Sequence, residues 1–106
     1  MRLWLDDLRP MPKDFDIWAK NADDAIKYLW VGKIDHISFD HDLGEGKTGY
    51  DIAQWVEHMA YNKQLPKFTW KVHSANPIGA ERIKIALSNA DMYWGEINER
   101  LYIKNN

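Results

Sequence analysis

The stretch Leu3-Trp4-Leu5-Asp6-Asp7 joins a short apolar run directly to two acidic residues. Ile37-Ser38-Phe39 leads in the same way into Asp40, and Trp70-Lys71-Val72 leads into His73. In a parallel α/β fold the carboxyl ends of the strands meet at one edge of the sheet, and ligands bind in the crevice outside them. We therefore expect these three ends to converge on one site.

The composition indicates a single domain over residues 1–106. A chain of this length buries roughly two-thirds of its unfolded surface, and its 45% hydrophobic and 13% aromatic content excludes a disordered class. The six Trp residues are interpreted as core residues. The sequence has no cysteine, which excludes disulfides and thiolate metal sites.

The charge pattern limits the partners that we expect. Fourteen basic and 16 acidic residues are well mixed and leave a net charge of −2, so no stretch favours long nucleic acid. A small phosphorylated ligand or an RNA terminus needs only local positive charge and stays possible. No apolar run approaches the roughly 20 residues of a membrane span, and the start of the sequence lacks a signal-peptide pattern. We expect a cytoplasmic protein without a membrane partner, whose oligomeric state the sequence does not predict.

Strand and helix patterns alternate along the chain, as in α/β folds. Strands are predicted over residues 2–5, 16–19, 34–39 and 68–73. Helices are predicted after three capping residues, Asn21, Thr48 and Asn76. The first has apolar residues on one side and ends near Gly32, and the second has its own buried stripe; these residues are Ala22, Ala25, Ile26, Leu29 and Trp30, and then Ile52, Trp55, Val56 and Met59.

The last part of the chain leaves two alternatives open. Residues 91–104 either continue the third helix or contain a fifth, edge strand near residues 101–103. The predicted fold is a small flavodoxin-like, three-layer α/β/α domain with a mainly parallel sheet of four or five strands. Its expected strand order is 2-1-3-4, with residues 68–73 at an edge because their polar and apolar residues alternate.

Asp6, Asp7 and Asp40 are the candidate metal ligands. In the expected strand order, the first and third strands are neighbours, and the gap between them is the topological switch point. Carboxylates gathered there repel one another unless a cation lies between them, and oxygen ligands of this kind suit Mg²⁺. The alternative is that Asp6 and Asp7 cap a turn and form an ion pair with Arg9.

His41 and His73 are the candidate acid–base residues. Both follow strand ends on the same rim, and imidazole titrates near neutrality, so a facing pair can act as general base and general acid. His36 and His58 are interpreted as structural, one beside a strand and one on a helix.

A candidate phosphate site follows His73. Ser74 offers a hydroxyl group, Asn76 suits a helix N-cap, and the amides of Ile78 and Gly79 are expected to point out of the helix end, where they can bind an anion. Gly79 is also expected to permit close approach of a ligand. Arg9 is a further candidate that can clamp a phosphate.

Together these motifs resemble a response-regulator receiver domain, and more specifically the cyclic-phosphate-processing receiver family found in phages and bacteria. The segments that carry the resemblance are Leu5-Asp-Asp-Leu-Arg9-Pro10, Ser38-Phe-Asp-His-Asp-Leu-Gly44, Thr48-Gly-Tyr-Asp51 and Val72-His-Ser-Ala-Asn-Pro-Ile-Gly79. The resemblance covers residues 1–94 and implies a receiver-like fold that processes cyclic phosphates, for example at RNA ends, in a bacterium or a phage-infected host. In a receiver, Asp40 corresponds to the phosphoacceptor and Ser74 to the switch hydroxyl. Two departures from receivers are the histidines and the lack of a lysine after a fifth strand, for which Lys104 is a poor substitute.

The leading hypothesis is therefore a metal-assisted phosphoesterase, with Mg²⁺ held by Asp7 and Asp40, with or without Asp6. One of His41 and His73 would activate water, and the other would protonate the leaving ribose oxygen. Two alternatives remain. The pocket could bind a cyclic nucleotide or RNA end without turnover, as a phage sponge against signalling would, or the chain could be a degenerate receiver phosphorylated on Asp40.

Overall fold

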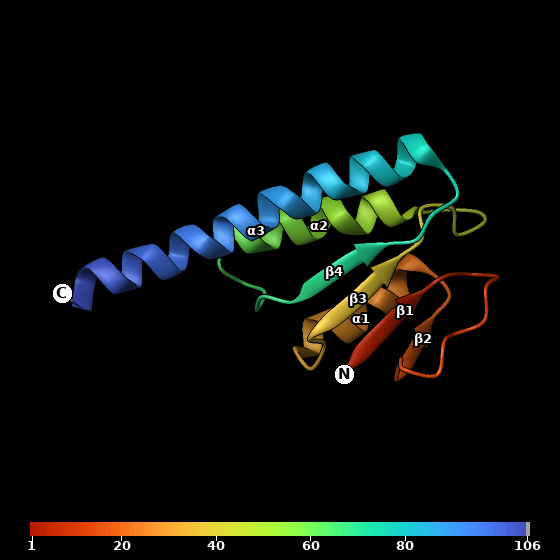
Figure 1. Ribbon diagram of the computed structural model, residues 1–106, viewed down its shortest axis with the longest axis horizontal. Helices are drawn as coiled ribbons and strands as arrows, with labels where there is room; N and C mark the ends of the chain where they lie inside the picture. The colour runs from red at the N-terminus through yellow and green to blue at the C-terminus, as the bar shows by residue number, and fades with distance from the viewer. Residues whose placement is uncertain (106) are drawn as a thin grey trace.

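The computed structural model describes the backbone of residues 1–105 and the side chains of residues 1–95. Four strands and three helices follow one another along the chain (Figure 1): β1 Arg2–Leu5, β2 Ile17–Ala19, α1 Ala22–Val31, β3 His36–Phe39, α2 Gly49–Tyr61, β4 Thr69–Val72 and α3 Pro77–Asn105. All four strands are parallel, in the order β2-β1-β3-β4. This confirms the predicted α/β class and the strand order.

The register of the sheet places the carboxyl ends of β1, β3 and β4 level with one another. Leu5 pairs with Phe39, and Phe39 pairs with Val72. The amide of Asp40 donates to the Leu5 carbonyl and the amide of His73 donates to the Phe39 carbonyl, so the ladder extends one residue past each of these strands. Asp6, Asp40 and His73 therefore lie at the same edge of the sheet, as the sequence predicted.

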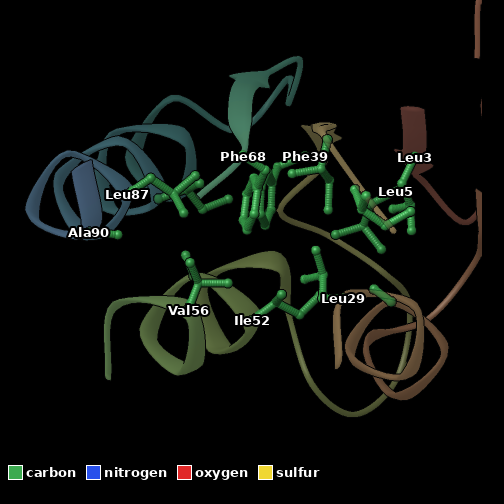
Figure 2. Close-up of a cluster of buried hydrophobic side chains, with 14 of the residues drawn as sticks. Leu3, Leu5, Leu29, Phe39, Ile52, Val56, Phe68, Leu87 and Ala90 are labelled. Carbon is green, nitrogen blue, oxygen red and sulfur yellow. The ribbon is translucent and has the colours of Figure 1, made fainter. Parts of the chain in front are cut away.

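One face of the sheet carries the hydrophobic core. Side chains alternate between the two faces of a strand, and the core side of β1 and β3 consists of Leu3, Leu5, Ile37 and Phe39, all fully buried. Figure 2 shows Leu3 and Leu5 of β1 across the core from Leu29 of α1, Leu87 of α3 across from Val56 of α2, and Phe39 and Phe68 between these two groups. The three helices therefore share a single core with this face.

The opposite face is covered by the loop between β1 and β2. Phe15 of this loop packs edge-on against Trp4 at 5.2 Å between ring centroids, and its ring centroid lies 6.0 Å from that of His36. Within residues 1–105 no helix connects β1 to β2. The structure thus differs in one respect from the three-layer description, because the second outer layer is a loop. Pro10 and Pro12 account for this, since proline disfavours a helix interior.

The helices begin where their capping residues predict. Asn21 accepts a hydrogen bond from the Asp24 amide, and Thr48 forms a reciprocal capping box with Asp51. Gly32 ends α1 in the left-handed conformation at φ 83°. Gly49, the first residue of α2, lies so close to the Asp40 carbonyl that an added Cβ atom would collide with it.

Three expectations from the sequence need correction or completion. Trp30 is 60% exposed, so it is not part of the buried side of α1, and among the six Trp residues only Trp4 and Trp94 are buried. Residues 91–104 continue α3, which runs beside α2 and extends past the sheet (Figure 1), so the fifth strand near residues 101–103 is not formed. Among the described residues, no helix combines the length and apolar character that crossing a membrane requires.

Candidate functional site

The acidic cluster at the switch point consists of Asp6, Asp7 and Asp40. One carboxylate oxygen from each lies within 4.8 Å of the others. Asp6 and Asp7 follow β1, and Asp40 follows the neighbouring strand β3. The structure therefore brings together the three residues that the sequence singled out as metal ligands.

Asp6 is the most constrained member of this cluster. Its side chain is 1% exposed, and Oδ1 accepts hydrogen bonds from the amides of Leu8 at 2.8 Å and Arg9 at 2.7 Å. Its Oδ2 lies 2.9 Å from Nε2 of His73. Burial acts to raise the pKa of Asp6, but the two amides and His73 outweigh it, so the pKa lies below its ordinary value and the carboxylate is ionised.

Asp40 is the member of the cluster whose pKa is raised by its surroundings. Its burial, and then the negative charge of Asp6, raise the pKa of Asp40 above its ordinary value, although hydrogen bonds from the Ser74 side chain and the His41 amide partly offset this. A cation between these carboxylates would remove the repulsion, and three hard oxygen donors suit a divalent ion such as Mg²⁺. By donor type and spacing, the cluster fits the metal that the sequence predicted.

Arg9 supplies positive charge beside the acids. A pocket of about 390 Å³ is lined by Asp6, Asp7, Leu8, Arg9, Asp40, Asp42, Gly44 and Ala75. The Arg9 guanidinium donates to the His73 carbonyl at 2.8 Å, which ties the loop after β1 to the end of β4. Among residues 1–95 Arg9 forms no ion pair with Asp6 or Asp7, so the predicted alternative of an Arg9 pair with these acids is not observed.

The two histidines lie in different surroundings. His73 lies behind Asp6, with Nδ1 2.7 Å from Ser38 Oγ and Nε2 2.9 Å from Asp6 Oδ2, and its ring stacks on Trp4. His41 lies beside the start of α3, and its Nδ1 is 2.8 Å from Asp42 Oδ1. Neither ring lines the pocket, although Asp42, the partner of His41, does. The two imidazoles therefore do not form a matching pair on either side of the pocket.

The start of α3 is arranged differently from the predicted anion site. Asn76 accepts the Gly79 amide hydrogen at 3.0 Å, so this amide is used by the helix cap. A Cβ atom on Gly79 would collide with the His41 ring, so this glycine makes room for an imidazole rather than for a ligand. Ile78 is 70% exposed. The expectation that the Gly79 amide is free for a phosphate is therefore wrong in this conformation.

Ser74 connects the end of β4 to the acidic cluster. Its hydroxyl oxygen accepts the Asn76 amide hydrogen at 3.1 Å, and its side chain lies near enough to Asp40 to lower the pKa of that carboxyl group. Asn76 Nδ2 also lies 3.5 Å from His41 Nδ1 and from Asp42 Oδ1. Ser74 thus lies next to Asp40, where a phosphoryl group near the cation would meet both.

Three further residues contribute to the site without having been predicted as site residues. Asp42 faces the pocket and holds His41, and this hydrogen bond lowers the pKa of Asp42 below its ordinary value. Ser38 contacts His73 from inside the sheet. Trp18 donates its indole hydrogen to the Asp6 carbonyl at 2.7 Å and so fixes the backbone of the acidic loop. The Asp40-His41-Asp42 triplet was a visible signal for the first, while the other two depend on strand register.

A parallel sheet in the order 2-1-3-4, with an acidic cluster between β1 and β3 and a hydroxyl group after β4, defines a receiver-like α/β domain. The family model for the cyclic-phosphate processing receiver domain matches residues 1–89. The chain belongs to this family. No curated protein and no solved structure gives a significant match to the chain.

Proposed function

We propose that this protein hydrolyses cyclic phosphate esters in a divalent-cation-dependent reaction, with 2′,3′-cyclic phosphate RNA ends or cyclic nucleotides as substrates. The observation that carries the proposal is the pairing of the acidic cluster with Arg9 in one pocket. Anionic carboxylates alone would repel a phosphate. A cation on Asp6, Asp7 and Asp40, together with the Arg9 guanidinium, turns the same pocket into a phosphate site.

The cation, held by Asp7 and Asp40 with Asp6, would neutralise charge on a phosphate oxygen and lower the pKa of bound water. Arg9, which is a lining residue of the pocket, would hold a second phosphate oxygen through its guanidinium. Ser74 lies near Asp40 and would donate its hydroxyl hydrogen to the phosphate. Together these groups would bind and orient the ester.

His41 would transfer the proton at the edge of the pocket, where its partner Asp42 is a lining residue although its own ring is not. Its Nδ1 lies against the Asp42 carboxylate, which can only accept, so Nδ1 carries the hydrogen and Nε2 of the neutral ring has a lone pair. Nε2 would take a proton from the attacking water as the new phosphorus–oxygen bond forms. The bond to the leaving ribose oxygen breaks, and that oxygen takes a proton from solvent, giving a phosphate monoester. A general base of this kind contributes roughly 10²–10⁴-fold.

The test is incubation of the full chain with 2′,3′-cyclic and 3′,5′-cyclic nucleotides, with Mg²⁺ and with EDTA. The proposal expects one class to be opened only with the metal, H41A to lose roughly 10²–10⁴ in rate, and H58A to match wild type. His58 is an exposed histidine on α2 outside the pocket and is the matched control. Binding without turnover would support a sponge-like binding module instead. Turnover in EDTA would show that the reaction does not need a metal held by the three acidic residues.

A second candidate function rests on Asp40 and Ser74. The Ser74 side chain lies near the Asp40 carboxylate and lowers its pKa. By the family resemblance, this carboxylate would correspond to a receiver phosphoacceptor. Signalling through a phosphorylated Asp40 would require labelling by acetyl phosphate that D40N abolishes. If no such labelling occurs with Mg²⁺ present, this candidate is rejected.

A further inference from the structure

The imidazole of His73 is held on three sides. Nδ1 lies 2.7 Å from Ser38 Oγ, and Nε2 lies 2.9 Å from Asp6 Oδ2. The ring stacks on the Trp4 indole with 3.9 Å between centroids and an interplanar angle of 4°. Both nitrogens are therefore engaged by protein groups, on the sheet face that the loop after β1 covers.

These contacts determine which nitrogen of His73 carries a proton. Oδ1 of Asp6 already accepts two amide hydrogens, and Oδ2 is the acceptor of this carboxylate that faces His73. Nε2 of His73 must therefore be the donor to Oδ2. In the neutral ring Nδ1 is then an acceptor, and the Ser38 hydroxyl, which is 5% exposed, is the group that donates to it.

The same contacts determine where Asp6 points. Oδ1 is fixed by the loop amides, Oδ2 is fixed by His73, and the side chain is almost fully buried. Hydrogen bonds behind a metal ligand orient it, and their loss typically weakens metal affinity by 10–100-fold. Trp4 adds a rigid plane, because its own indole hydrogen is donated to the Arg9 carbonyl at 3.0 Å.

We infer that His73 is a positioning residue, supported by Ser38 and Trp4, that orients Asp6 in the cation site and takes no part in proton transfer. The inference rests on the proposed function only in placing a divalent cation at the acidic cluster. By this inference, Ser38 of β3 contributes to the site by holding His73 in place. It also leaves His41 as the single acid–base histidine.

The first test uses the wild-type protein and needs no substrate. Nitrogen-15 histidine spectra above neutral pH should show His73 as the tautomer protonated on Nε2. A ring protonated on Nδ1 instead would overturn the inference.

The second test measures the affinity for Mg²⁺ and Mn²⁺ by titration calorimetry. H73F keeps a ring that can stack on Trp4 but loses both nitrogens, and its affinity should fall by roughly 10-fold or more. H73Q keeps an amide donor for Asp6, so its cation affinity should stay within about 3-fold of wild type. The matched control for S38A is S88A, a change at an exposed serine on α3, and its affinity should also stay within about 3-fold of wild type. S38A should weaken the affinity measurably.

Wild-type affinity in folded H73F would overturn the inference, and so would an equal loss in H73F and H73Q. If H73F does not fold, the wild-type spectra and H73Q decide. Failure of the proposed function is distinguishable. A protein that opens no cyclic nucleotide but shows the Nε2 tautomer and this order of cation affinities supports the role of His73 while rejecting phosphoesterase activity.

Discussion

The imidazole of His41 occupies the place where a side chain on Gly79 would begin. A Cβ atom added to Gly79 would lie 2.7 Å from His41 Nδ1 and closer still to Cγ, which no packed structure accommodates. The first turn of α3 therefore packs directly against the His41 ring, whose Nδ1 also lies 2.8 Å from Asp42 Oδ1. The orientation of the proposed general base depends on this missing side chain.

We predict that G79A lowers turnover of a cyclic phosphate towards the level of H41A, a loss of roughly 10²–10⁴-fold. Cation affinity should not change, because Gly79 does not contact the acidic cluster. The control is G95A, also in α3, where an added Cβ meets nothing within 4 Å. G95A should keep full activity and gain up to about 1 kcal/mol of stability from helix propensity. Full activity in G79A would show that packing of the His41 ring against Gly79 is not needed for turnover.

Removing the charge of Asp40 should stabilise the cation-free protein. The pKa of Asp40 is raised in the folded state by burial and by Asp6, so folding disfavours its ionised form. The free energy of unfolding therefore decreases as pH rises through the folded-state pKa of Asp40, and it stays lower at neutral pH. D40N is expected to raise Tm at neutral pH by a few degrees. Wild type at a Mg²⁺ concentration about 100 times Kd should gain about 2.7 kcal/mol, and D40N should gain far less. Equal stabilisation of both by Mg²⁺ in thermal melts would contradict Asp40 as a ligand.

Acid sensitivity near neutrality should depend on His36. Burial, and then the positive charges of Arg2 and Lys71, lower the pKa of His36 in the folded state. As pH falls through the unfolded value near 6.5, the unfolded chain takes up the proton first, so stability decreases between about pH 7 and pH 5. H36Q should lose less stability than wild type over this interval in urea unfolding.

The control for this comparison is H58Q. His58 is exposed on α2, so H58Q should follow wild type across the same interval. The assignment to His36 would be refuted by equal pH dependence in wild type and H36Q.

Packing of α2 against the end of β3 should not tolerate a side chain at Gly49. An added Cβ would collide with the Asp40 carbonyl, and the Gly49 amide also donates to the His41 carbonyl at 2.8 Å. We expect G49A to destabilise the fold by about 1–3 kcal/mol, as overpacking does, and to disturb the acidic cluster. Urea unfolding beside G95A measures this, and an unchanged midpoint would show that α2 shifts freely.

Local patterns predicted most of the fold because they act within a few residues. Asn21, Thr48 and Gly32 set helix ends through hydrogen bonds and backbone conformation that neighbours decide. The sequence after Asn89 does not decide its own secondary structure, because an apolar run such as 101–103 suits either a strand or a helix; the backbone there forms helix α3. The prediction that Trp30 lies on the buried side of α1 is wrong, because helical spacing alone does not determine how much of the helix surface is buried.

For the site, the sequence determined which residues gather. Acidic residues that directly follow adjacent parallel strands must meet at the switch point, so Asp6, Asp7 and Asp40 were predictable from their position after β1 and β3. Only the tertiary structure decided what each side chain contacts. His73 turns to Ser38 and Asp6 because of the register between β3 and β4, and His41 turns to Asp42 because α3 offers Gly79 beside it. Strand register and helix docking are set by the packing of the whole core, and no short stretch of sequence contains that information.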